Sequence, residues 1–143
     1  MKMSKTRLFV SKKLSANILI YIKNKQHHFL KNVLRIKKED SVNLFDGFTG
    51  EWLSKVISIN RDNIVLQIQN KLREIPKETD LWLIFAPIKS YRMNITIQKA
   101  TELGISRFIP ILTEYTNQSK INFKNFELNM IEASEQSERL SIP

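Results

Sequence analysis

Short apolar stretches fill the first half of the chain and predict a series of β-strands. They lie at residues 7–10, 17–22, 41–45, 51–59 and 64–69. In the last stretch every second residue is a branched aliphatic, at Ile64, Leu66 and Ile68, which is the period of a strand with one buried face. Short strands at such regular spacing favour a small barrel.

Turns and one helix interrupt these strands. Asp46-Gly47, with Gly50 close behind, suits a tight hairpin, and residues 60–63 suit another. Between residues 25 and 35 the apolar residues instead recur at helical spacing, at Phe29, Leu30, Val33 and Leu34. We therefore expect one helix that plugs or flanks the barrel.

The pattern changes after the last of these strands. Residues 72–80 carry Pro and charge without apolar periodicity, which indicates a domain boundary. Beyond them, residues 81–86 (LWLIFA) form a continuous apolar run, which is typical of a strand buried on both faces. A helix at 92–103, a second apolar strand at 105–112 and a helix at 125–139 follow. This alternation of strand and helix predicts a right-handed parallel unit.

The two helices of this unit each show an apolar face. Met93, Ile97 and Ala100 share one face of the first helix. Gly104 stands where a left-handed C-terminal cap is wanted. In the second helix the corresponding face carries Phe126, Met130, Ala133 and Ser137.

Two parallel strands and two helices make an incomplete domain. About 60 residues cannot cover both faces and the edge of such a sheet, so we expect the opening part of a larger α/β domain. The predicted fold class is therefore α/β with an all-β N-terminal part. Its parts are a small β-barrel at 1–70, a linker at 71–80 and an incomplete α/β domain at 81–143.

Composition narrows the class of protein. A chain of 143 residues with 42% hydrophobic residues can bury a core, and it has no Cys for disulfides, CxxC zinc sites or thiol nucleophiles. No apolar run approaches the roughly 18 residues of a membrane span. The N-terminus (MKMSKTRLFV) reaches a polar Ser-Lys-Lys before a signal segment develops. We therefore expect a soluble, cytoplasmic protein.

Positive charge is concentrated in the first half. Residues 1–70 hold 13 Lys and Arg against 5 Asp and Glu, whereas residues 71–143 hold 10 against 9. Such an excess on one segment is typical of a nucleic-acid-binding module, because Lys and Arg release counterions from phosphates. A solubilising surface is the alternative, since the chain is rich in Lys, Ile and Asn throughout.

Recognisable catalytic motifs are few. The glycines Gly47, Gly50 and Gly104 form no nucleotide loop, and no GxSxG nucleophile motif is present. His27 and His28 have no third ligand at metal spacing, which favours surface or packing roles over a metal site.

Two further clusters can be interpreted as either structural or functional. The acidic residues between 132 and 138 fit a solvated helix face better than a catalytic group. The aromatic residues Phe45, Phe48 and Trp52 flank the predicted hairpin turn beside the basic segment. Core packing is favoured for each of them over stacking on nucleic-acid bases.

Longer segments carry a more specific resemblance. Residues 98–114 (QKATELGISRFIPILTE) resemble the QKATELGV-S-x-I-P-x-x-T/S-E signature of the bacterial 16S rRNA (uracil-N3)-methyltransferase E family. Residues 135–139 (EQSER), followed by Ile142-Pro143, resemble its E-Q-S/C-G-R with V-P close behind, and Glu138 stands where the family usually has Gly. Three shorter elements also resemble the family, namely His28 with residues 33–35 (H-x4-V-L-R), residues 44–47 (L-F-D-G) and residues 89–93 (K/R-G-x-K/R-M, with Ser90 for Gly).

The resemblance implies a PUA-like barrel that holds rRNA and a SPOUT-type methyltransferase domain. Members of the family form homodimers and transfer a methyl group from S-adenosylmethionine to uridine N3 of 16S rRNA during maturation of the 30S subunit. Their cofactor pocket is a C-terminal knot with GPEGG and LGxxILRxETA segments, which are absent from this sequence. We therefore expect no cofactor-binding residue, no metal and no membrane contact in this chain. A truncated, catalytically inactive RNA-binding fragment is the alternative.

The resemblance and the charge together give candidate site residues. Methylation of uridine N3 requires loss of a proton, which a carboxylate or a cation that stabilises the anion can assist. Glu135 and Arg139 are the catalytic candidates, with a structural role in helix packing as the alternative. The RNA-binding candidates are Arg7, Lys12, Lys13, His28, Lys31, Arg35, Lys37, Lys38, Lys89 and Arg92.

Overall fold

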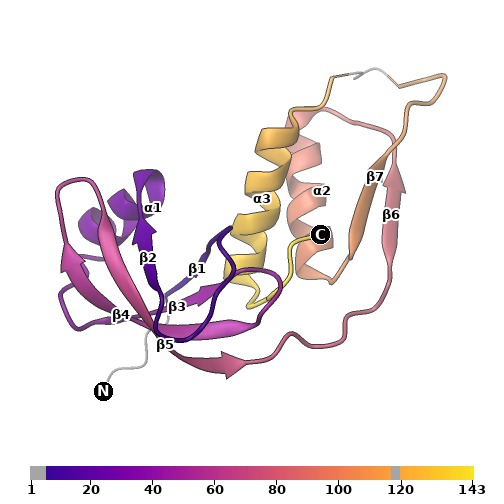
Figure 1. The fold of residues 1–143 in the computed structure, drawn as a ribbon. Helices are drawn as coiled ribbons and strands as arrows, with labels where there is room; N and C mark the ends of the chain where they lie inside the picture. The colour runs from indigo at the N-terminus through magenta and orange to yellow at the C-terminus, as the bar shows by residue number, and fades with distance from the viewer. Residues whose placement is uncertain (1–5, 117–119) are drawn as a thin grey trace. The chain divides into compact units, whose positions relative to one another are not determined.

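The computed structural model describes residues 6–116 and 120–143, which form two compact units (Figure 1). The first unit is Met1–Ile75 and the second is Pro76–Pro143. The first is a curled sheet with a short helical segment, and the second has two helices beside two strands. This agrees with the expected fold class, an all-β part followed by an α/β part.

A single five-stranded sheet makes up most of the first unit. Its strands run in the order β1-β3-β4-β5-β2. β1 pairs parallel with β3, and the other neighbours pair antiparallel. The bounds are β1 Arg7–Phe9, β2 Leu19–Ile22, β3 Ser41–Phe45, β4 Glu51–Ile59 and β5 Ile64–Arg73. Register shifts between β4 and β5 let this pair bend strongly, which is how so small a sheet wraps around a core.

The core of the first unit lies on the concave face of this sheet. The predicted buried positions of β5 are confirmed, because Ile64, Leu66 and Ile68 are all fully buried, but Val65 between them is buried as well. Leu30 reaches the same core from the helical segment. The predicted turn at residues 60–63 also forms, with the Asn60 N–H donating to the Asn63 carbonyl oxygen at 2.8 Å.

The predicted helix at 25–35 is wrong in detail. It consists of α1 (Asn24–His28) and a π-helical turn η1 (Phe29–Val33), in which the Leu34 N–H donates to the Phe29 carbonyl five residues earlier at 3.0 Å. A π-turn holds more residues than an α-turn, so spacing by three and four no longer selects one face. Of the four apolar residues only Leu30 is buried, while Phe29, Val33 and Leu34 are exposed.

β5 is longer than the sequence predicts and shortens the predicted linker. It continues to Arg73, where it pairs with the first residue of β4, Glu51. Its last residues are exposed and, apart from Leu72, polar, so apolar periodicity could not reveal them. The end of this strand is held by an ion pair between Arg73 and Glu51 of β4.

In the second unit two parallel strands lie beside two helices (Figure 1). They are β6 (Trp82–Phe85), α2 (Ser90–Glu102), β7 (Arg107–Pro110) and α3 (Phe123–Gln136). The predicted parallel pairing is confirmed, with Leu83 opposite Phe108. Phe85, Phe108 and Phe126 pack ring against ring between sheet and helices, with centroids 5.5 to 6.4 Å apart.

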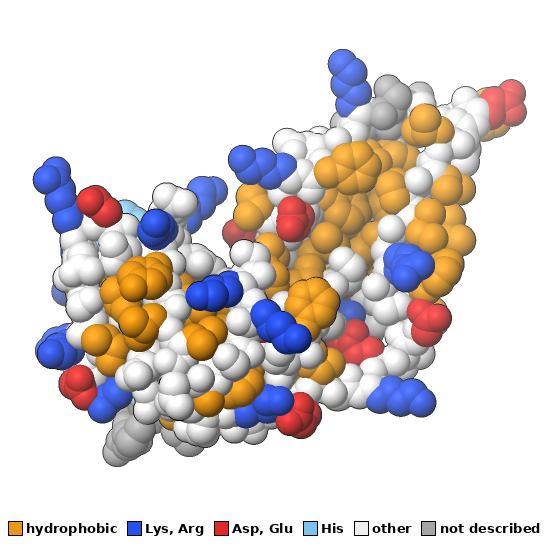
Figure 2. Space-filling view, viewed as in Figure 1, with side chains coloured by type: hydrophobic (Ala, Val, Ile, Leu, Met, Phe, Trp, Pro, Cys, Tyr) orange, Lys and Arg blue, Asp and Glu red, His pale blue; other side chains and the backbone are white. Residues whose placement is uncertain are grey.

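β6 is not buried on both faces as the sequence predicts. Trp82 and Ile84 are 45% and 58% exposed, whereas Leu83 and Phe85 are partly buried. The reason is that α2 and α3 contact one face of the sheet only. Figure 2 shows hydrophobic side chains gathered where β6 and β7 lie in Figure 1.

The bounds of both strands and both helices of this unit differ from the predicted bounds by a few residues. α2 begins at Ser90 and ends at Glu102, and α3 ends at Gln136, so Ser137 is an exposed C-cap and not a core position. Gly104 has φ +94°, which confirms the predicted left-handed residue after α2. Glu138 takes the same left-handed conformation after α3, with φ +60°.

Candidate functional site

The turn between β3 and β4 is built around a buried carboxylate. Asp46 is 1% exposed, and its Oδ1 accepts from the N–H groups of Phe48 and Thr49 at 2.9 and 2.7 Å. Its Oδ2 accepts from Thr49 Oγ1 at 2.6 Å and from the Leu14 N–H at 2.8 Å. Burial acts to raise the pKa of Asp46, but these hydrogen bonds outweigh it and hold the pKa below its ordinary value. The charged Asp46 therefore fixes the turn.

A second buried carboxylate, on β4, joins this strand to three others. Glu51, 3% exposed, accepts from Arg7 Nε at 2.7 Å through Oε1 and from Arg73 Nε at 2.5 Å through Oε2. Asn43 Nδ2 donates to Oε1 at 3.2 Å. Burial acts to raise the pKa of Glu51, but the hydrogen bonds and charges of Arg7 and Arg73 outweigh it and lower the pKa. The first unit therefore contains a charged cluster that links β1, β3, β4 and β5.

Arg7 is committed to this cluster. Its side chain is 7% exposed, and its guanidinium lies 4.9 Å from the centroid of the Phe45 ring. A buried guanidinium has little surface for phosphate, which argues against the predicted RNA contact of Arg7. Sequence reasoning missed Glu51, because a single Glu at the start of an apolar strand gives no signal of its partners.

Most other predicted RNA-binding residues of the first unit lie on its surface. Lys31 is partly buried and donates from Nζ to the Asn60 carbonyl oxygen at 3.0 Å, and a ring nitrogen of His27 lies 3.3 Å from the same oxygen. In Figure 2, Lys and Arg side chains project from many places around this unit. The exposed candidates are Lys12, Lys13, His28, Arg35, Lys37 and Lys38.

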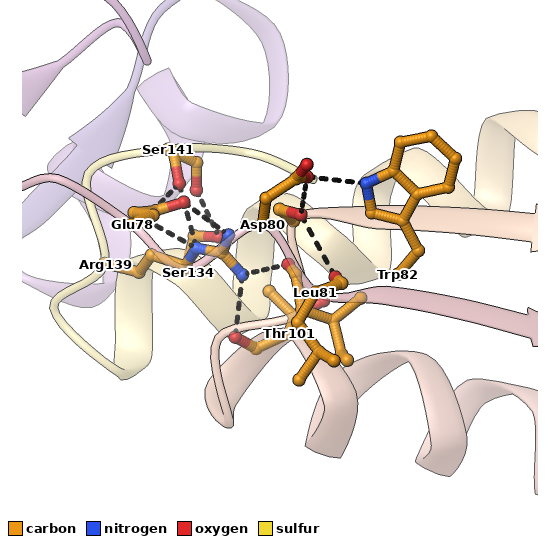
Figure 3. A network of polar contacts seen from close by, with 10 residues as sticks. Glu78, Asp80, Leu81, Trp82, Thr101, Ser134, Arg139 and Ser141 are labelled. Atoms are coloured by element: carbon orange, nitrogen blue, oxygen red, sulfur yellow. Dashed lines mark hydrogen bonds and ion pairs between the residues drawn. The ribbon is translucent and has the colours of Figure 1, made fainter.

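In the second unit Arg139 organises a polar network that Figure 3 shows from close by. Its Nη1 donates to the carbonyl oxygens of Thr101 and Ile105 at 3.0 and 2.7 Å, across the turn that follows α2. Its Nη2 and Nε donate to the carboxylate of Glu78 at 2.8 and 3.2 Å, and Nε also lies 2.9 Å from Ser141 Oγ. Arg139 thus connects three chain segments far apart in the sequence.

Glu78 is the acidic partner in this network. It accepts from Arg139 and from Ser141 Oγ, which is 2.5 Å from Oε1. Burial acts to raise the pKa of Glu78, but these hydrogen bonds and the Arg139 charge outweigh it and lower the pKa. Nothing in the sequence pointed to Glu78, which lies in a charged stretch without periodicity.

The two catalytic candidates occupy different surroundings. Arg139 lies in the network around Glu78, whereas Glu135 lines a groove between α2 and α3 with Tyr91, Ile95 and Gln98. Glu135 is half-buried there. Glu135 therefore borders the groove, and Arg139 is engaged with Glu78 and two backbone carbonyl oxygens.

The two RNA-binding candidates of the second unit lie at the opposite end of α2 from the Arg139 network. Lys89 is the residue before the helix and Arg92 is in its first turn, and both are exposed. Within residues 6–116 and 120–143, no group of three His, Cys, Asp or Glu side chains is placed to hold a metal ion. No helix in the same ranges is long and apolar enough to cross a membrane.

Family models match both units. The model of an RNA methyltransferase PUA domain matches residues 22–69, and the model of an RNA methyltransferase domain matches residues 75–143. Among curated proteins, the ribosomal RNA small subunit methyltransferases E of Rickettsia conorii and Buchnera aphidicola are 33% and 30% identical to this chain. The alignments cover 99% and 100% of the chain, which spans about three fifths of the length of these relatives, 58% and 61%.

Solved structures agree in fold. A methyltransferase from Legionella pneumophila with bound cofactor SAM matches with a TM-score of 0.86 and 22% identity, over 99% of this chain and 61% of that one. A ribosomal RNA small subunit methyltransferase E from Neisseria gonorrhoeae, bound to S-adenosyl methionine, matches with a TM-score of 0.83 and 21% identity, over 96% and 59%. The fold of both units is therefore that of known methyltransferases.

Proposed function

This chain belongs to the ribosomal RNA small subunit methyltransferase E family, whose members it matches over their N-terminal part, and we propose from this that it acts in methylation of 16S rRNA. The reaction is transfer of a methyl group from S-adenosylmethionine to uridine N3. The first unit binds the RNA, and the second contributes to the methyl-transfer domain. As in the family, the partners are the 30S subunit and a second copy of the protein, in the cytoplasm.

Roles for the two catalytic candidates follow from their surroundings. Arg139 has most of its donors engaged with Glu78, Thr101 and Ile105, so its role is to position the turn after α2. Glu135, half-buried at the groove between α2 and α3, is the candidate for accepting the uridine proton.

The apolar hollow at the end of the two parallel strands does not by itself fit S-adenosylmethionine. Beyond the carboxyl ends of β6 and β7, where open α/β sheets bind ligands, the surface hollow is lined by Pro87, Pro110, Ile111, Leu112, Ile121 and Phe123. These apolar side chains offer no charged partner for the carboxylate of the cofactor. No step of the reaction is therefore assigned to cofactor contacts of these residues.

RNA binding by the first unit is carried by one observation. Residues 1–70 carry a net charge of +8, and nine Lys, Arg or His residues are exposed within residues 6–70, six of which are RNA-binding candidates. Phosphate contacts of such side chains make the affinity fall steeply with salt concentration. On single strands, each contact adds about 0.7 to the slope of log affinity against log salt concentration.

The test is binding of the purified chain to a 16S rRNA fragment at several salt concentrations. Exchange of Lys37 and Lys38 for Gln should lower the slope by about 1.4, twice the single-contact value. Lys124→Gln, on the exposed side of α3, is the matched control and should leave the slope unchanged. Salt-independent binding, or no binding at low salt, contradicts the proposal.

RNA binding without methyl transfer is the second candidate function, and the apolar hollow beyond β6 and β7 favours it for these 143 residues. Titration calorimetry with S-adenosylmethionine, together with a methyl-transfer assay on 30S subunits, separates the two candidates. We expect neither micromolar binding of the cofactor nor incorporation of methyl groups by this chain alone. Either result would show that a cofactor pocket forms within it.

A further inference from the structure

An exposed aromatic ring stands at the tip of the turn between β3 and β4. Phe48 is 81% exposed, whereas Phe45 and Trp52, the other aromatic residues of this hairpin, are buried. Core packing thus explains Phe45 and Trp52 but not Phe48. A large apolar side chain held outside the core is available for contact with a ligand.

The backbone that carries Phe48 is held rigidly. The Phe48 N–H donates to the buried carboxylate of Asp46, and so do both donors of Thr49. Trp52 Nε1 donates to Thr49 Oγ1 at 2.9 Å, which ties the turn to a core residue. The position of the Phe48 backbone is therefore set before any ligand arrives, which lowers the entropic cost of binding.

The same carboxylate holds two lysines beside this turn. Residues 11–13 (Ser-Lys-Lys) are anchored on one side by the Val10 N–H, which donates to the Phe45 carbonyl at 3.0 Å. On the other side the Leu14 N–H donates to Asp46 Oδ2 at 2.8 Å. Lys12 and Lys13 lie between these anchors and are exposed. Two exposed lysines and one exposed aromatic ring thus lie on two segments, 11–13 and 46–49, that are hydrogen-bonded to each other through Asp46.

We propose that this turn, residues 46–49, and the anchored segment 11–13 form a binding site for an unpaired nucleotide of RNA. Phe48 stacks on the base, and Lys12 and Lys13 contact the neighbouring phosphates. Stacking needs an open base face, which a nucleotide inside a duplex does not offer, whereas the lysines alone would accept any phosphate backbone. The site rests on the proposed RNA binding of the first unit and adds to it a preference for single strands.

The charge of Asp46 does not oppose this ligand. Its two oxygens accept four hydrogen bonds from the turn and from Leu14, and the carboxylate is buried beneath the site. The exposed atoms of the site are those of the ring and the ammonium groups. The buried anion organises the backbone, and the exposed cations meet the phosphate.

The experiment measures affinity of the whole chain for a single-stranded 16S rRNA oligonucleotide and for a duplex of the same sequence. Phe48→Ala should weaken single-strand binding at least about fivefold, leave duplex binding unchanged and leave the salt slope unchanged. Phe48→Trp should bind like the parent and Phe48→Leu should bind like Phe48→Ala, because an aromatic ring stacks on a base and a leucine side chain does not. Tyr21→Ala, on β2 and 57% exposed, is the matched control and should have no effect.

The lysines are tested by the double exchange of Lys12 and Lys13 for Gln. It should reduce the salt slope by about 1.4 with the single strand and by about 1.8 with the duplex. Melting curves of all variants should match the parent, since none of these side chains is buried.

Failure of this site can be told apart from failure of RNA binding itself. If the parent chain binds no RNA in a salt-dependent manner, the proposed function fails. If the parent binds but Phe48→Ala equals Tyr21→Ala, or Phe48→Leu equals the parent, the stacking site is wrong. An effect of Phe48→Ala on 30S subunits that is absent with protein-free RNA also overturns it, because the ring then contacts a ribosomal protein.

Discussion

Replacement of Glu138 by Gly should stabilise the second unit. Glu138 has φ +60°, a left-handed conformation that costs an L-residue about 1–2 kcal/mol and costs Gly almost nothing. Gly has a larger entropy in the unfolded chain, which subtracts about 0.5–1 kcal/mol. The net gain in free energy of unfolding is therefore about 0.5–1 kcal/mol.

The charge of Glu138 adds a smaller effect of the same sign. It is the second residue after α3, where the negative end of the helix dipole disfavours a carboxylate by about 0.3–1 kcal/mol. Glu138→Gln removes the charge but keeps the backbone strain, and it also keeps a side chain of similar length. The difference between the Gly and Gln variants therefore excludes the effect of the charge.

The assay is calorimetric melting combined with hydrogen exchange of the α3 amides, which reports on the second unit specifically. A gain of about 0.5–1 kcal/mol raises the melting temperature of a unit this size by about 2–8 °C. Glu138→Asn, which tolerates the left-handed region, should fall between Gln and Gly. If the Gly variant is no more stable than the Gln variant, residue 138 is not strained in solution and the reasoning is refuted.

Three further variants test other features of the fold. Gly104→Val should lower the melting temperature of the second unit by about 4–8 °C, because a side chain at φ +94° is strained by about 1 kcal/mol. The strain comes from the backbone alone, since no atom lies within 4 Å of the added Cβ. An unchanged melting curve would mean that residue 104 is not left-handed. Gly50→Ala should lower the free energy of unfolding, measured in denaturant melts, clearly more than Gly104→Ala does, since its Cβ would overlap the Arg73 carbonyl oxygen. Equal losses in the two variants would contradict this. The lowered pKa values of Glu51 and Glu78 provide stability that is complete above their ordinary value of 4.5 and is lost as the pH falls through the lower folded values. Glu51→Gln should therefore cost about 3 kcal/mol near neutral pH, where it leaves Arg7 buried beside an uncharged partner, and much less near pH 3, with urea midpoints as the measurement.

Apolar periodicity was sufficient to predict the strands that bury every second residue. β3 and β4 were predicted to the residue, and the parallel pairing of β6 with β7 followed from two apolar runs separated by a helix. Periodicity failed where another interaction determines the structure. The end of β5 is polar and is held by Arg73 on Glu51, and η1 has a helical repeat that differs from that of an α-helix.

The candidate site was predictable only where residue type alone decides the position. Charged residues in short polar loops, such as Lys12 and Lys13, are exposed as expected. Arg7 and Arg139 have the same side chain as surface arginines but are held by Glu51 and Glu78, which lie 44 and 61 residues away in the sequence. No local pattern encodes partners at such distances. Position 138 is the exception, since the departure from the family's usual Gly marked the residue that proves left-handed.

The Glu51 cluster also sets an order of events during synthesis on the ribosome. β1 remains without its ion-pair partner until Glu51 has been made, and the cluster is complete only when Arg73 emerges. At that point every strand of the first unit is available, whereas β7 still awaits more than thirty residues. Domains that emerge first generally fold first. We therefore expect the first unit to reach its final structure while the second is still being translated, so that the surface proposed to bind RNA forms before the rest of the chain has left the exit tunnel.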